Sequence, residues 1–86
     1  MTKRSRSKKI TDTSASAQRV RLLERLQLGP VSTFDARFDM NIMAPAPRIK
    51  ELREQGHPIL TDRQTLTDPL GFEHEGVAVY YLSGAA

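Results

Sequence analysis

The residues whose types and spacing are best suited to binding a ligand are three cationic side chains, Arg48, Lys50 and Arg53. Guanidinium and ammonium groups bind phosphate oxygens and the acceptor edge of guanine. Glu51 lies among them, and its carboxylate can accept a hydrogen bond from the amino group of cytosine. These residues predict a surface that binds a nucleic acid, with Lys50 toward base edges or phosphate and the two arginines on flanking phosphates.

The helix that carries these cations is predicted to begin near Pro45 or Ala46 and to end at Gln55. Pro45 and Pro47 are tolerated only in the first turn of a helix, where amide hydrogens have no helical partner. Gly56 follows the last helical residue, where a glycine commonly ends a helix in the left-handed conformation. The start and the end of this helix are therefore both marked.

The same charges also fit a solvated helix face. The helical period places Ile49 and Leu52 toward a core. It places Lys50, Glu51 and Glu54 on the outward side. Lys50 and Glu54 have the spacing of a stabilising ion pair, and both glutamates would repel phosphate. A DNA-contacting face and a charge-compensated, solvated face are both compatible with the sequence.

A first helix is predicted over residues 15–27, and Gly29 and Pro30 mark its end. Its apolar residues recur at three- and four-residue spacing and form one stripe, which consists of Val20, Leu22, Leu23 and Leu26. Such a stripe predicts a helix that packs on one side against the rest of the domain.

A second helix is predicted from Ser32 to the neighbourhood of Asn41. Ser32 is its N-cap, and Asp35 completes an arrangement close to a capping box. Asn41 tolerates the left-handed conformation that stops a helix. Ser32 and Thr33 can offer phosphate a hydroxyl and a helix N-terminal amide, whereas simple capping is the alternative role of Ser32.

Beyond Pro58 the apolar pattern changes to that of strands. Residues 59–61 with 64–66 predict one strand and residues 77–82 a second, joined by a loop of about eight to ten residues into an antiparallel hairpin. An isolated hairpin is marginal in water, so this one must pack on the helices. Arg63 is a candidate phosphate contact. The loop itself suits a minor groove poorly, because it carries the carboxylates Asp68, Glu73 and Glu75.

Three segments of the chain, VRLLERLQLGPVSTFDA, RIKELREQGHPILT and GVAVYYL, carry a family resemblance. Through them residues 17–82 resemble the small winged helix-turn-helix domains of phages and prophage regions, and the second segment is the most specific. The resemblance implies an α+β fold, with a three-helix core followed by a two-stranded antiparallel β-hairpin wing. It also implies a third helix that contacts DNA beside the wing. Pro45 and Pro47 depart from the family's pattern.

The first residues of the chain differ in composition from the rest. Residues 1–14 are rich in Lys, Arg, Ser and Thr, and they predict a disordered basic arm before a domain over residues 15–86. Five cations lie within the first nine residues, which leaves eight basic and ten acidic side chains in residues 10–86. The segment fits either a phosphate-binding arm or a solubilising tail, and its cations are Lys3, Arg4, Arg6, Lys8 and Lys9.

The composition argues against several other classes of protein. The 86 residues include no cysteine and only two histidines, which predicts neither a disulfide nor a metal site. No nucleophile–base set or glycine-rich phosphate loop is recognisable, so we expect no enzyme, no cofactor and no small-molecule substrate. No apolar run approaches the roughly 18 residues of a membrane span, and no apolar segment follows the basic N-terminus. A cytoplasmic location without a membrane partner is expected.

These observations predict a sequence-specific double-stranded DNA-binding protein, of the kind that serves in phages as a transcriptional regulator or recombination accessory factor. The helix over residues 45–55 would enter the major groove, with the arm on phosphates. The alternative is a winged-helix module that docks on another protein without direct DNA binding, because the chain without its arm is slightly negative. A homodimer or a partner protein is compatible with either function, since one small module gives limited specificity.

Overall fold

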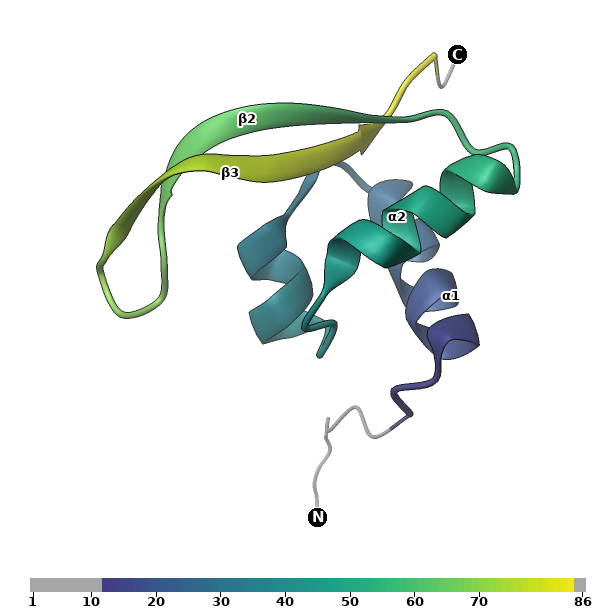
Figure 1. Cartoon of the computed structure of the whole chain (residues 1–86), viewed down its shortest axis with the longest axis horizontal. Coiled ribbons are helices and arrows are strands. Elements are labelled where there is room, and N and C mark those ends of the chain that lie inside the picture. The colour runs from purple at the N-terminus through teal and green to yellow at the C-terminus, as the bar shows by residue number, and fades with distance from the viewer. Residues whose placement is uncertain (1–11, 85–86) are drawn as a thin grey trace.

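The computed structural model describes residues 12–84, which form two α-helices, a π-helical turn and a three-stranded antiparallel sheet (Figure 1). This is the predicted α+β class. The basic arm, up to residue 11, lies outside the described residues. In chain order the elements are α1 (Ala15–Leu26), β1 (Val31–Ser32), η2 (Asp35–Asp39), α2 (Pro45–Glu54), β2 (Ile59–Thr67) and β3 (Glu73–Leu82).

Helix α1 packs on one side, as its stripe predicts, but the buried side is narrower than expected. Leu22 and Leu26 are buried, and Leu23 is partly buried against the core. Val20 is wrongly predicted as a core residue, because 55% of its surface is exposed. The helical period carries Val20 well round the helix from Leu22, beyond the contact with the other elements.

The segment before α2 is capped as predicted but wound differently. The Ser32 amide donates to Asp35 Oδ2 at 3.0 Å, and the Asp35 amide donates to Ser32 Oγ at 2.9 Å, which makes a reciprocal cap. The predicted α-helix is π-helical over η2, so the described residues contain two α-helices and this wider turn in place of the predicted three-helix core. Asn41 has the predicted left-handed conformation, with φ of 54°. The next residue, Ile42, returns into the core and is fully buried.

The sheet has one strand more than the predicted two-stranded hairpin. Its order is β1-β3-β2, with Val31 opposite Tyr80 and Ser32 opposite Val79. The prediction was incomplete because a strand of two residues is too short to produce an alternating apolar pattern. Strand β1 attaches the hairpin to the segment that leads into η2.

The hairpin strands are longer than predicted and leave only residues 68–72 between them. The predicted loop of about eight to ten residues is therefore wrong. Both strands extend through polar residues that show no apolar alternation. The alternation is missing because both faces of this far part of the hairpin are exposed to solvent. Tyr80 is buried and Tyr81 is exposed, as the two-residue period of a strand requires.

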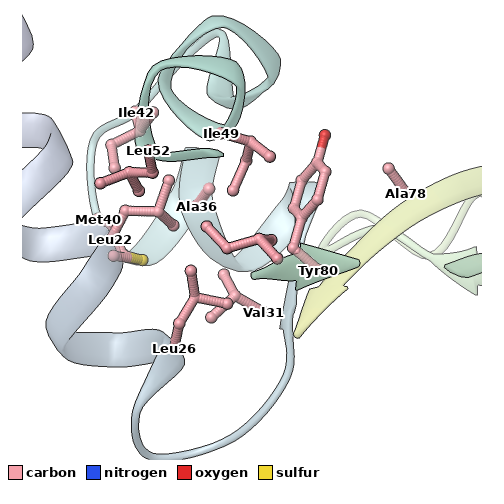
Figure 2. Packing of buried hydrophobic residues seen from close by; sticks show 11 residues of the cluster. Leu22, Leu26, Val31, Ala36, Met40, Ile42, Ile49, Leu52, Ala78 and Tyr80 are labelled. Atoms are coloured by element: carbon pink, nitrogen blue, oxygen red, sulfur yellow. The ribbon is translucent and has the colours of Figure 1, made fainter. Parts of the chain in front are cut away.

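One core joins these elements where α1, η2, α2 and the base of the sheet meet (Figure 2). Ile49 and Leu52 of α2 are buried there, as predicted. They fix the inward face of α2 and therefore determine which of its residues face solvent. The buried cluster comprises Leu22, Leu26, Val31, Ala36, Met40, Ile42, Ile49, Leu52, Ile59, Ala78 and Tyr80.

Candidate nucleic-acid interface

A groove of about 450 Å³ lies between the first turn of α2 and the hairpin. Residues 44–47 line it on the side of α2, and residues 74–78 line it on the side of β3. Arg63 of β2 and Arg37 of η2 also line this groove, and both arginines are exposed. The fold thus brings two cations from different elements to the groove that borders the start of α2.

Each of these arginines is anchored by a backbone oxygen. Arg37 Nε donates to the Met43 carbonyl at 2.9 Å, and Arg63 Nη1 donates to the Gly76 carbonyl at 3.2 Å. A guanidinium has further N–H donors that can hold phosphate oxygens. Arg63 was a predicted candidate, whereas Arg37 was missed. The sequence signal that could have placed Arg37 on the outer side of its turn is the small apolar Ala36 before it, which the structure buries.

Glu51 lies against α1 rather than in solvent. Arg19 Nη1 of α1 donates to Glu51 Oε1, and Arg48 Nη2 donates to Glu51 Oε2, both at 2.9 Å. Arg48 Nε is also 2.9 Å from Oε1, but outside hydrogen-bond geometry, so this contact is an electrostatic one. The bond from Arg19, with the positive charge of Arg48, lowers the pKa of Glu51. The prediction that Glu51 points outward is wrong, because Arg19 pairs with it across the helices.

Arg53 joins the end of α2 to the hairpin. Its Nε donates to the Ile59 carbonyl at 2.6 Å, and its Nη2 donates to Thr61 Oγ1 at 2.8 Å. Lys50 remains on the outer side, with 76% of its side chain exposed. Its Nζ lies 2.7 Å from Glu54 Oε2, which confirms the ion pair of the solvated-face interpretation, and this bond raises the pKa of Lys50. The cations of α2 therefore point in different directions.

The two predicted hydroxyl groups have internal partners. Ser32 Oγ accepts the Asp35 amide hydrogen and so caps the helical turn that leads into η2, which is its simpler predicted role. Thr33 Oγ1 donates to the Ala78 carbonyl of β3 at 3.0 Å and so supports the junction with the sheet. The predicted arm cations, Lys3, Arg4, Arg6, Lys8 and Lys9, lie outside the described residues.

A family model described as a winged helix-turn-helix domain matches residues 17–85. The chain belongs to this family. Winged helix-turn-helix domains in general bind DNA and are typically not enzymes. Neither the curated proteins nor the solved structures compared with the chain gave a match.

In this winged helix-turn-helix domain the wing is formed by β2 and β3, and its tip is built around Asp68. The Asp68 Oδ1 atom accepts the amide hydrogens of Leu70 and Phe72, each at 2.9 Å. Its Oδ2 atom lies 2.8 Å from His74 Nε2, and this bond is the main reason that the pKa of Asp68 is lowered. The His74 ring meets Phe34 edge to face at 5.3 Å between centroids. These contacts hold the wing tip in one shape near η2.

The described part of the winged helix-turn-helix domain, residues 12–84, lacks two other kinds of feature. Within residues 12–84, no group of three or more His, Cys, Asp or Glu side chains is arranged to hold a metal ion. No helix in the same range is both long and apolar enough to cross a membrane.

Proposed function

We propose that this protein binds double-stranded DNA in a sequence-specific manner, with the first turn of α2 in the major groove and the wing beside it. The observation that carries this proposal is the shared groove, which residues 44–47 line together with Arg37 and Arg63. In this proposal the two guanidinium groups hold phosphates near the segment that reads bases. Lys50, exposed one turn further along α2, adds a third cation on the outer side.

The arginines of α2 have a positioning role in this proposal. Arg48 binds Glu51, and Arg53 binds the carbonyl of Ile59, so both orient α2 within the domain. Lys50 is different, because an exposed pair such as Lys50–Glu54 is weak and can exchange glutamate for phosphate. In this proposal Arg48 and Arg53 are therefore no longer phosphate contacts, and Arg37 joins the predicted Arg63 and Lys50 in that role.

Backbone amides at the start of α2 contribute less to phosphate binding than those at the start of most helices. Pro45 and Pro47 have no amide hydrogen, so the first turn of α2 has few donors for a phosphate. Phosphate binding therefore depends on side chains. The five cations of the arm add to those of the groove, and each neutralised phosphate contributes roughly −0.9 to the log–log dependence of affinity on salt.

The test is a salt titration of duplex binding with matched variants. Arg37→Ala and Arg63→Ala should each weaken binding at 50 mM salt and reduce the slope by about 0.9. Arg25→Ala is the control, because Arg25 lies in the last turn of α1 and away from the groove. Unchanged slopes in both groove variants, or equal losses in all three, would contradict the proposed interface.

The resemblance to phage and prophage domains supports a role as a transcriptional regulator or recombination accessory factor, acting in the cytoplasm, alone or as a homodimer. Selection of duplexes from a random pool, followed by sedimentation of the complex, tests specificity and stoichiometry together. A pool that gives no enriched sequence contradicts the sequence-specific part of the proposal.

A second candidate function is docking on another protein without direct DNA binding. It is supported by the wing tip, where Leu70 and Phe72 expose 83% and 64% of their surfaces beside the exposed carboxylates of Glu73 and Glu75. Exposed apolar side chains of this kind are common anchors of protein interfaces. Failure of the full-length protein to bind any duplex at 50 mM salt would favour this function over the first.

A further inference from the structure

The leading end of α2 offers bases an apolar surface. The exposed residues at this end are Met43, Ala44, Ala46 and Pro47, none of which has a strong hydrogen-bonding side chain. Arg48 follows them, but it is turned toward Glu51. The segment that would enter the major groove first therefore contains no arginine, asparagine or glutamine available for base edges.

Such a surface restricts what can be read in the major groove. Guanine, adenine and cytosine are distinguished there by hydrogen-bond donors and acceptors, whereas thymine also presents its C5-methyl group. An aliphatic surface can recognise only this methyl group by direct contact. Recognition of base edges by main-chain amides is also limited here, because Pro45 and Pro47 have no amide hydrogen to donate.

The residues in question are also well suited to an apolar contact. Alanine and proline lose almost no side-chain entropy when they are buried in an interface. Ala46 and Pro47 lie in the first turn of α2, whose inward face is fixed by the buried side chains of Pro45 and Ile49. Their outward surface is therefore already in place before DNA arrives.

We propose that α2 reads thymine methyl groups through Ala46 and Pro47, so that this protein selects sites with thymines in the contacted major groove. The inference rests on the proposed DNA binding. Affinity and base selection are then divided between separate residues. Arg37 and Arg63 hold the backbone, and the apolar turn of α2 that lines the same groove selects the bases.

The experiment compares a duplex obtained by selection with the same duplex in which dU replaces dT in the selected site. Deoxyuridine keeps every hydrogen bond of thymidine and lacks only the C5-methyl group. We expect roughly a fourfold loss of affinity for each contacted methyl, the factor that corresponds to burying one group of that size. The same replacement in the flanking sequence should have no effect.

Two variants connect this loss to α2. Pro47→Ser replaces the ring by a hydroxyl group at an exposed position, and it should bring the dT to dU affinity ratio closer to one. Val20→Ala is the control, because it also shortens an exposed apolar side chain but lies on α1, away from the groove. It should leave the ratio unchanged. Circular dichroism of each variant verifies that the helices are intact.

The outcomes separate this inference from the function on which it rests. Intact binding with equal affinity for the dT and dU duplexes overturns the methyl readout and leaves DNA binding standing. A dU effect that Pro47→Ser does not alter also overturns the assignment to α2. Absence of binding to either duplex at 50 mM salt overturns both proposals.

Discussion

Arg19 and Glu51 are separated by 32 residues in the sequence, and they meet at 2.9 Å where α1 packs against α2. Arg48 binds the other oxygen of the same carboxylate, so one glutamate ties both arginines into a single network. This network supports the orientation of α2 that its buried residues Ile49 and Leu52 fix.

The first prediction concerns the pH dependence of this network. The pKa of Glu51 is lowered in the folded state, so its stabilising contribution is complete above the pKa of the unfolded chain and is lost as the pH falls through the folded value. Glu51→Gln should therefore lower Tm at pH 7, and the difference from the wild type should shrink toward acidic pH. Thermal unfolding at several pH values measures this.

Glu54→Gln is the matched control for that experiment, because the ion pair of Glu54 with Lys50 is exposed to solvent. It should change Tm at pH 7 much less than Glu51→Gln does. Equal effects of the two substitutions, or a pH-independent effect of Glu51→Gln, would show that the network does not stabilise the fold.

The parts of the fold that were predictable are those specified by local chemistry. The proline pair marks the start of α2, the Ser32–Asp35 pair marks the start of the helical turn before it, and Asn41 marks the end of that turn. Each signal acts over a few residues. The partner of Glu51 and the strand β1 depend on contacts between distant segments, and a single sequence contains no local signal for such contacts.

The second prediction separates a structural role of Arg53 from a phosphate contact. Arg53→Ala removes hydrogen bonds to Ile59 and Thr61 and should cost about 1–2 kcal/mol of unfolding free energy in urea denaturation. Arg53→Lys keeps the charge but cannot form both bonds at once, so it should lose most of the same stability and keep the salt slope of DNA binding. A stable Arg53→Ala variant with a smaller slope would instead indicate a phosphate contact.

The third prediction concerns the reciprocal cap before η2. Ser32→Ala leaves the Asp35 amide without its acceptor, and it should cost about 1 kcal/mol, or roughly 4–8 °C in Tm for a domain of this size. Ser16→Ala makes the same chemical change at an exposed position inside α1, where alanine favours a helix. A loss of stability in both variants, or in neither, would contradict the assigned role of the cap.

The fourth prediction concerns the acidic side of the wing. Glu75 lines the groove with Arg37 and Arg63, so its carboxylate opposes phosphate binding there. Glu75→Lys should raise duplex affinity several-fold at 50 mM salt and steepen the salt slope by up to about 0.9. Glu24→Lys, on the exposed side of α1, makes the same charge change away from the groove and should have a smaller effect. Equal gains would mean that only the total charge matters.

The sequence predicted which types of residue form the candidate site better than it predicted how those residues are arranged. The sequence identified Lys50 and Arg63 as exposed cations, and both lie on the outside of the domain. It could not assign Arg48 and Arg53 to internal partners, because the helical period defines the direction of a side chain but not what lies opposite it. Arg37 was overlooked since its closeness to Arg63 arises only when the hairpin folds over η2.

Strand β1 has a final consequence for how a duplex is recognised. Because Val31 and Ser32 are hydrogen-bonded into the same sheet as the wing, the distance between wing and α2 is set before any ligand arrives. In the proposed binding mode, a duplex must match that spacing with its own groove width and local bending. This mode discriminates against stiff or unusually wide sites through their deformation energy, even at base pairs that no side chain touches.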